Sequence, residues 1–109
     1  MPVFELLEDL DGKFKNHFKK HVQMTEITRY ALQLNNTTWL VVTNQKLYLL
    51  QKKLLFITTW IEKLQKVKRV TSDGQVFYIH TEKKSKQVNV EPAKKSQAVK
   101  LAEEIKKII

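Results

Sequence analysis

Histidines and acidic residues, the side chains most often used for catalysis or metal binding, are few in this chain. His17 and His21 are four residues apart, so on a helix they would share a face, as a metal-binding pair does. Neighbouring lysines would repel a cation, however, and no third ligand of a suitable type lies nearby in the sequence. His80 falls in a strand-like segment. We therefore expect no metal site, no catalytic triad and no cofactor.

Glycines and paired acids also fail to indicate an enzyme. Gly12 and Gly74 are the only glycines, so the chain has no glycine-rich loop of the kind that holds phosphates. The acidic pairs at positions 8–9 and 103–104 lie in helix-like segments and are expected to face solvent. These observations predict a binding protein without enzymatic activity.

Lysine dominates the charge of the chain. Lys and Arg number 20 against 11 Asp and Glu, which gives a net charge of +9, and only Arg29 and Arg69 are arginines. Lysine attracts anionic surfaces as a compact charge, whereas arginine makes directional, bidentate contacts with phosphates and bases. The balance favours diffuse attraction to acidic lipids, with a merely solubilising surface as the alternative. The candidate anion-binding residues are Lys19, Lys20, Arg29, Lys52, Lys53, Lys83, Lys84 and Lys86.

Nucleic-acid binding is a competing prediction from the same charge. Single-stranded nucleic acids are usually held by aromatic side chains that stack on the bases. Here Trp39, Tyr48, Phe56 and Phe77 all fall in apolar runs typical of a protein core, where their rings would be hidden. Because arginine is also scarce, nucleic acid is a less favoured partner than an anionic membrane.

Residues 38–51 are the segment around which the rest of the chain could complete a sheet. This segment contains two apolar runs separated by a short polar break around Asn44. Its valine, threonine and tryptophan content favours strands over a buried helix. Two strand-like runs with a short polar connection predict a β-hairpin with at least one buried face.

Five further segments are typical of strands, and two helices flank the set. Asn35-Asn36 and Asp73-Gly74 are the clearest turn signals. The N-terminal helix should pack on the rest of the domain through a phenylalanine and leucine face, or alternatively lie on a membrane or a partner. The C-terminal helix should begin at Pro92. The predicted ranges are 24–34, 54–64, 65–71, 76–81 and 87–90 for strands, and 1–22 and 92–109 for helices.

This order predicts an α+β, mainly β, fold formed by a single domain over residues 1–109. Short turns require antiparallel neighbours, and seven strands around so small a core should curl into a sandwich or a partly open barrel. No run of about 18 apolar residues is present, so no transmembrane segment is expected. The N-terminus is acidic where a signal peptide would be basic, and the absence of cysteine fits a reducing compartment. We therefore expect a cytoplasmic protein or an excised domain that attaches peripherally to a membrane.

The same order resembles the pleckstrin-homology (PH) superfold, a seven-stranded antiparallel, partly open barrel capped by a C-terminal helix, here with an additional N-terminal helix. Residues 42–50, Val-Thr-Asn-Gln-Lys-Leu-Tyr-Leu-Leu, resemble a hairpin of PH-like families. In that hairpin, leucine and threonine are followed, after a short spacer, by lysine or arginine, then leucine and tyrosine. Residues 61–80 resemble the tail-homology-1 region of class I myosins, which is itself PH-like. The resemblance covers roughly residues 38–82 and implies phosphoinositide or acidic-lipid binding.

One feature of PH-like lipid sites is missing from this chain. The resemblance places basic residues in the loop between the first two strands, but residues 35–37 contain neither lysine nor arginine, and Arg29 is the only base nearby. We therefore do not assign an inositol-phosphate site there. Two functions remain open: a module that binds anionic membranes through diffuse lysine contacts, and a protein-interaction module that uses a sheet edge or the groove beside the C-terminal helix.

Overall fold

The structure is a computed structural model that describes residues 12–22 and 26–109. The predicted helical residues before Gly12, and residues 23–25 at the start of the first predicted strand, lie outside the described part. Seven strands lie between two helices, in the predicted order. The elements are α1 (Gly12–His21), β1 (Thr28–Asn35), β2 (Thr38–Thr43), β3 (Lys46–Lys52), β4 (Ile57–Lys63), η2 (Leu64–Lys66), β5 (Val67–Ser72), β6 (Val76–Thr81), β7 (Ser85–Asn89), η3 (Pro92–Lys94) and α2 (Lys95–Lys106).

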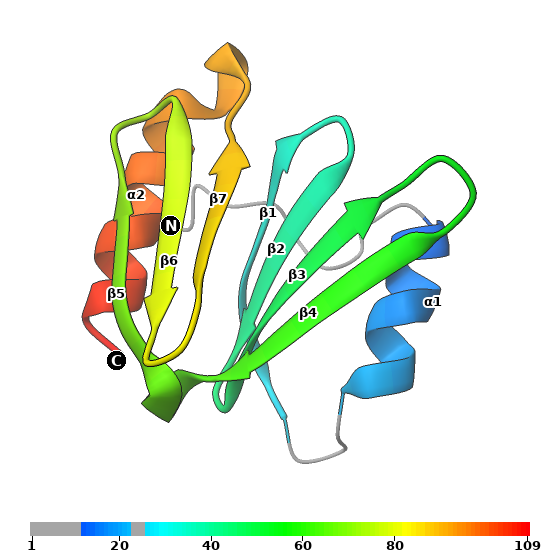
Figure 1. Cartoon of the computed structure of the whole chain (residues 1–109), viewed down its shortest axis with the longest axis horizontal. Helices are drawn as coiled ribbons and strands as arrows, with labels where there is room; N and C mark the ends of the chain where they lie inside the picture. Colours follow the sequence, from blue (N-terminus) through cyan, green and yellow to red (C-terminus); the bar gives the residue numbers. More distant parts are fainter. Residues whose placement is uncertain (1–11, 23–25) are drawn as a thin grey trace.

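The first four strands form one antiparallel sheet in the order β1-β2-β3-β4 (Figure 1). Its centre is the hairpin predicted for residues 38–51, in which Trp39 pairs with Leu50 and Leu40 with Leu49. Strand β4 continues the sheet by pairing Trp60 with Leu49. The predicted hairpin is therefore confirmed, and it forms the middle of the larger sheet.

The last three strands form a second antiparallel sheet in the order β5-β6-β7, which η2 connects to β4. The predicted Asp73-Gly74 turn joins β5 to β6. Gly74 has a φ of 93°, a conformation that disfavours side chains, and Asp73 Oδ1 accepts hydrogen bonds from the N–H groups of Gln75 and Val76 at 2.8 and 2.9 Å. These backbone bonds lower the pKa of Asp73.

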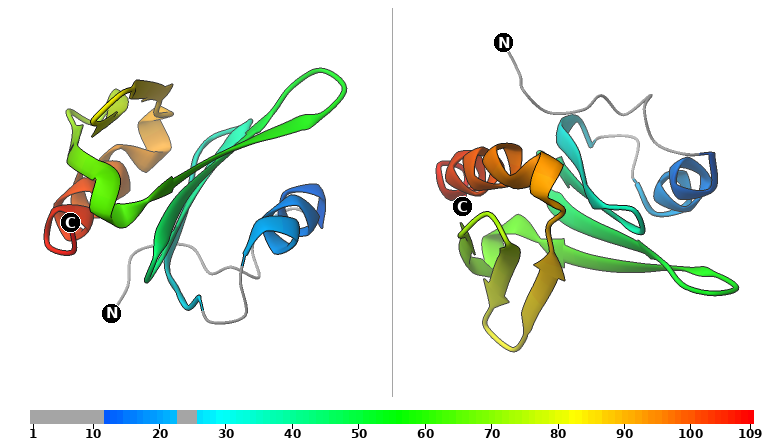
Figure 2. Two further views of the ribbon diagram at one scale, coloured as in Figure 1. Left: turned by 60° about the horizontal axis from the view of Figure 1, so that its bottom comes forward. Right: turned by 90° about the horizontal axis from the view of Figure 1, so that it is seen from above.

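The larger core fills the space between the two sheets and α2. Leu49 and Phe77, one from each sheet, are fully or almost fully buried there, and α2 contributes Ala98, Leu101 and Ile105. The views in Figure 2 show α2 lying along one side of the two sheets, where it packs mainly against β5 and also against β1. The apolar spacing predicted for the C-terminal helix is the face that α2 buries.

A second, smaller core lies on the opposite face of the first sheet, under α1. Phe14 and Phe18 of α1 are buried against Trp39 and Tyr48, and the Phe18 and Tyr48 rings meet edge to face at 4.9 Å. Because helices or strands cover both faces, β2 is buried along its whole length. This explains why residues 39–42 form a continuous apolar run instead of alternating with polar residues.

The observed architecture confirms the coarse prediction of a mixed, mainly β fold with a C-terminal helix. The sheets of the described chain do not close into a barrel. Some boundaries differ: β1 begins at Thr28, β7 begins at Ser85 and so includes Lys86, and a 3-10 turn precedes α2. None of the described helices is both long and apolar enough to span a bilayer.

The predicted strand over residues 54–64 is wrong at its beginning. Strand β4 starts at Ile57, and Leu54, Leu55 and Phe56 form the turn that precedes it. Their composition is typical of a strand, but the pairing of Lys52 with Ile57 places them beyond the last paired residues. Phe56 is consequently exposed, and the expectation that it belongs to the core is also wrong.

Candidate functional site

The β3–β4 turn extends beyond the body of the first sheet (Figures 1 and 2). Strand pairing continues to Lys52 and Ile57, and the backbone N–H of Lys53 then donates a hydrogen bond of 2.6 Å to the carbonyl of Phe56. This backbone bond closes the turn between the two strands.

Three consecutive apolar side chains occupy this turn. Leu54 is 95% exposed, Leu55 89% and Phe56 62%. Single exposed apolar residues are normal on a protein surface, whereas a contiguous exposed group is a candidate surface for contact with a membrane or another molecule. We call Leu54, Leu55 and Phe56 the apolar tip.

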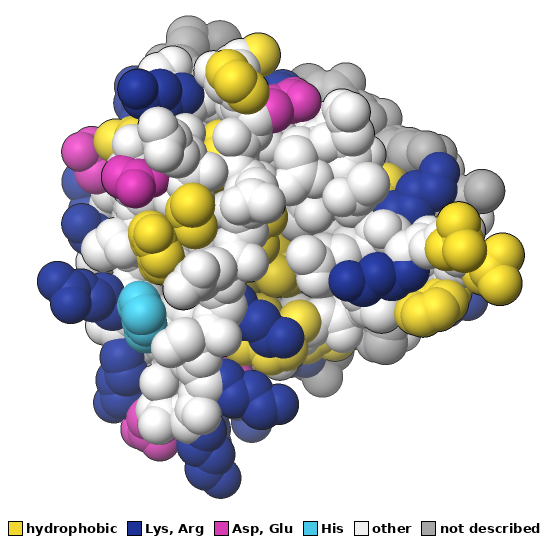
Figure 3. Space-filling model, turned by 45° about the horizontal axis from the view of Figure 1, so that its top comes forward, with side chains coloured by type: hydrophobic (Ala, Val, Ile, Leu, Met, Phe, Trp, Pro, Cys, Tyr) yellow, Lys and Arg dark blue, Asp and Glu magenta, His cyan; other side chains and the backbone are white. Residues whose placement is uncertain are grey.

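Two lysines stand directly before the apolar tip. Lys52 and Lys53 are both exposed, and Figure 3 shows hydrophobic side chains with lysines beside them at this end of the molecule. An apolar group can enter the boundary between lipid headgroups and acyl chains while neighbouring ammonium groups remain at the phosphates. The arrangement is therefore chemically suited to an anionic lipid surface.

The remaining predicted anion-binding residues lie elsewhere. Lys83 and Lys84 are in the β6–β7 turn, which Figures 1 and 2 place at a different corner from the β3–β4 turn. The others are spread over three elements: Lys19 and Lys20 in α1, Arg29 in β1 and Lys86 in β7. The structure thus brings only Lys52 and Lys53 next to the apolar tip.

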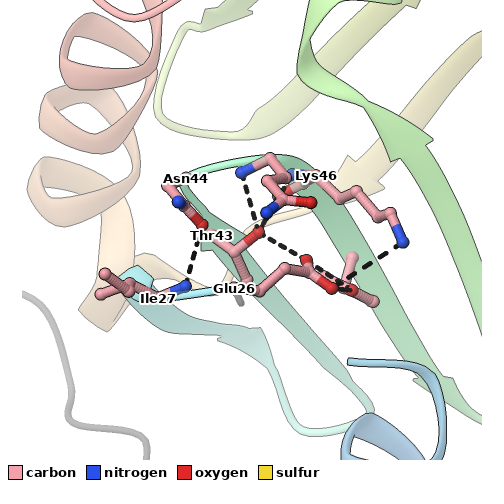
Figure 4. Close-up of polar contacts among 7 residues, drawn as sticks. Glu26, Ile27, Thr43, Asn44 and Lys46 are labelled. Atoms are coloured by element: carbon pink, nitrogen blue, oxygen red, sulfur yellow. Dashed lines mark hydrogen bonds and ion pairs between the residues drawn. The ribbon is translucent and has the colours of Figure 1, made fainter. Parts of the chain in front are cut away.

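The β2–β3 turn, at the other end of β3, is held by a network of side chains around the carboxylate of Glu26 (Figure 4). The hydroxyl groups of Thr43 and Tyr48 each donate to Glu26 Oε1 at 2.7 Å, and Lys46 Nζ lies 3.8 Å from Oε2. The Glu26 side chain is fully buried. Three partners therefore compensate for the burial of one carboxylate.

Bonds to the backbone complete that network. Thr43 Oγ1 accepts hydrogen bonds from the backbone N–H groups of Gln45 and Lys46, at 3.2 and 3.0 Å. Asn44 exchanges two bonds with the backbone of Ile27, at 2.8 and 2.9 Å. The polar residues of the segment that resembles PH-like hairpins consequently have structural roles in this chain.

Burial and the bond to Glu26 together raise the pKa of Tyr48, with burial the larger cause. Sequence reasoning missed Glu26, which lies 17 residues before Thr43 and 22 before Tyr48. No local pattern connects residues so far apart. In the structure the segment before β1 lies beside the β2–β3 turn and brings Glu26 to Thr43 and Tyr48.

Of the three histidines, His80 is the one whose side chain lies in the described part of the chain. His80 Nδ1 lies 3.0 Å from Ser85 Oγ, and the His80 ring stacks with Tyr78. His17 and His21 are on α1, but their side chains lie outside the described part. No group of three His, Cys, Asp or Glu side chains in the described chain could hold a metal ion.

Comparisons with protein-family models, with curated proteins and with solved structures found no match for this chain. A fold by itself does not define a function, because one architecture supports many activities. The function must therefore be inferred from the exposed surfaces described above.

Proposed function

We propose that this chain is a PH-like binding module that attaches peripherally to anionic membrane surfaces. Two antiparallel sheets with a C-terminal helix, together with the hairpin pattern at residues 42–50, support the PH-like assignment. The observation that carries the membrane function is the apolar tip with Lys52 and Lys53 directly before it. The other lysines and the net charge of +9 add a long-range attraction.

The energies involved suit a reversible attachment. Full burial of a leucine or phenylalanine side chain contributes about 1.5–3 kcal/mol, and insertion at the headgroup boundary about half of that. Each lysine near an anionic surface contributes about 1 kcal/mol. The apolar tip and its two lysines would together contribute roughly 4–6 kcal/mol, enough to bind membranes without anchoring the protein permanently.

The composition of the tip favours a lipid surface over the alternatives. A nucleic acid would use the lysines but would leave Leu54 and Leu55 exposed to water. A protein partner would need a groove shaped for the tip, whereas a bilayer accepts apolar side chains of any shape. The absence of bases at residues 35–37 favours recognition of surface charge in general over recognition of one phosphoinositide headgroup.

Vesicle sedimentation tests this function directly. We expect the chain to sediment with phosphatidylcholine vesicles that contain phosphatidylserine, and to remain in solution with phosphatidylcholine alone. Vesicles in which phosphoinositide replaces phosphatidylserine at equal charge should bind to a similar extent. Failure to bind phosphatidylserine vesicles at about 50 mM salt, where surface charges are weakly screened, would exclude the proposal.

A further inference from the structure

Strand β4 forms one edge of the first sheet and pairs, within the described chain, only with β3. The bond from Leu64 N–H to the Gln45 carbonyl, 3.0 Å long, fixes which residues of β4 face β3. Because bonding alternates along an antiparallel pair, Thr59 and Ile61 direct their backbone N–H and C=O groups away from β3. No described residue bonds to these groups.

This edge has few of the features with which proteins usually prevent strand addition. Those features are prolines, bulges, very short strands and charged side chains along the edge. The β4 sequence Ile-Thr-Thr-Trp-Ile-Glu-Lys is mostly β-branched or aromatic, has no register irregularity against β3, and carries charge only at Glu62 and Lys63. The edge is thus a suitable template for one more strand.

A cleft of about 290 Å³ lies beside the second half of β4. It is bounded on one side by Trp60, Ile61 and Glu62, and on the other by Lys66 and the β6–β7 turn. The Trp60 side chain is only partly buried, and Lys86 Nζ lies 5.6 Å from the centre of its ring. The cleft therefore offers an apolar surface and room for the side chains of an added segment.

The charge around the cleft indicates the kind of segment that fits. Lys66, Lys83 and Lys84 are exposed and form no ion pair with any described residue. Of the two glutamates in the lining, Glu82 is paired with Lys68 at 3.2 Å. The surplus is positive, so an acidic segment is attracted while a second copy of this chain, with a net charge of +9, is repelled.

We propose that the edge of β4 binds an extended acidic segment of a partner protein, which adds to the first sheet as a fifth strand. The backbone of Thr59 and Ile61 bonds to the segment, and Lys66, Lys83 and Lys84 bind its carboxylates. The cleft lies toward the end of β4 that is remote from the β3–β4 turn. A membrane-attached module would therefore keep this site accessible to the partner.

A synthetic strand provides the probe. We would use a fluorescent, end-blocked peptide of alternating valine and glutamate, about eight residues long to match a typical strand. Titration should give saturable binding, and the backbone amide shifts should change mainly in β4 and in the β6–β7 turn. A valine and lysine peptide of equal length is the control and should not bind.

Two changes separate strand addition from simple charge attraction. Ile61→Pro removes one outward N–H without altering a bond to β3, and should weaken binding about tenfold, whereas Ile61→Val should not. A second test needs no protein variant and uses two peptides, one N-methylated on the valines and the other on the glutamates. Their affinities should differ, because the backbone N–H groups of only one of these sets point toward β4. Lys83→Glu with Lys84→Glu should also weaken binding about tenfold.

Absence of saturable binding, or equal binding of the two N-methylated peptides, would overturn the proposal. A dimer that Ile61→Pro disrupts would instead assign the edge to a second copy of the chain. Ile61→Pro is expected to leave vesicle binding unchanged. A failure of this proposal is therefore distinguishable from a failure of the membrane function.

Discussion

The two turns at opposite ends of β3 contrast in how they use their side chains. In the β2–β3 turn, Thr43, Asn44 and the distant Glu26 all bond to neighbouring groups and fix the turn in place. In the β3–β4 turn a backbone bond from Lys53 to Phe56 closes the turn, and the apolar tip remains exposed. The first turn uses its side chains for the fold, whereas those of the second are available for binding.

Removing the apolar tip should have the largest effect on binding. We expect Leu54→Ser, Leu55→Ser and Phe56→Ser together to weaken binding to phosphatidylserine vesicles by at least about 100-fold, because roughly 3 kcal/mol of apolar transfer is lost. The urea midpoint should not fall, since these side chains contact no core. Vesicle sedimentation and urea unfolding measure the two quantities.

Ile27 and Ile109 provide the matched control, because both are exposed apolar residues outside the tip. Ile27→Ser with Ile109→Ser should leave vesicle binding within about twofold of the original. An equal loss of binding in both variants would mean that general surface hydrophobicity, rather than this turn, drives attachment.

Thr43→Val should have the opposite pattern: reduced stability and unchanged binding. The substitution keeps the shape of the side chain, removes one of the three partners of Glu26 and leaves two backbone N–H groups without their acceptor. We expect the free energy of unfolding to fall by about 2–3 kcal/mol. Thr58→Val, a threonine replacement on β4 outside this network, should cost less than about 1 kcal/mol; equal losses would argue against a special role for the β2–β3 turn.

Replacing the two lysines beside the tip should weaken binding less than removing the tip itself. Lys52→Ala with Lys53→Ala should reduce vesicle binding roughly 10- to 30-fold at low salt, as expected for about 1 kcal/mol per lysine. The reduction should shrink as salt is added. Lys83→Ala with Lys84→Ala is the comparison, and if it weakens vesicle binding as much, the membrane contact is spread over both corners.

The smallest expected effect concerns pH and the β2–β3 turn. The raised pKa of Tyr48 means that, above pH about 10, the unfolded chain loses this proton while the folded chain retains it. The free energy of unfolding should therefore decrease as pH rises beyond that value. Urea midpoints across this range should fall less steeply for Tyr48→Phe; identical slopes would show that Tyr48 does not contribute.

Local sequence information was sufficient where neighbouring residues determine the structure. The hairpin at residues 38–51, the Asp73-Gly74 turn and the apolar face of α2 all follow from short-range patterns, and all are present. The composition of the apolar tip predicts a strand. Its exposure depends on the register of β3 against β4, which long-range pairing determines.

The candidate site was predictable only in part for the same reason. The sequence predicts anion binding by Lys52 and Lys53, but it also predicts that residues 54–56 belong to a strand and that Phe56 lies in the core. The open edge of β4 depends on the order of strands in the sheet, which a single sequence does not specify. The role of Glu26 in the β2–β3 turn could not be predicted either, because its partners Thr43 and Tyr48 lie 17 and 22 residues away in the sequence.

A fluorescent label in the apolar tip tests the central claim most directly. The chain contains no cysteine, so Leu55→Cys and, as the control, Ile109→Cys each allow one polarity-sensitive label to be attached. We predict a blue shift on addition of phosphatidylserine vesicles for the label in the tip, and none for the label at position 109. Vesicle binding without a blue shift in the tip, or with equal shifts at both positions, would contradict insertion of the β3–β4 turn.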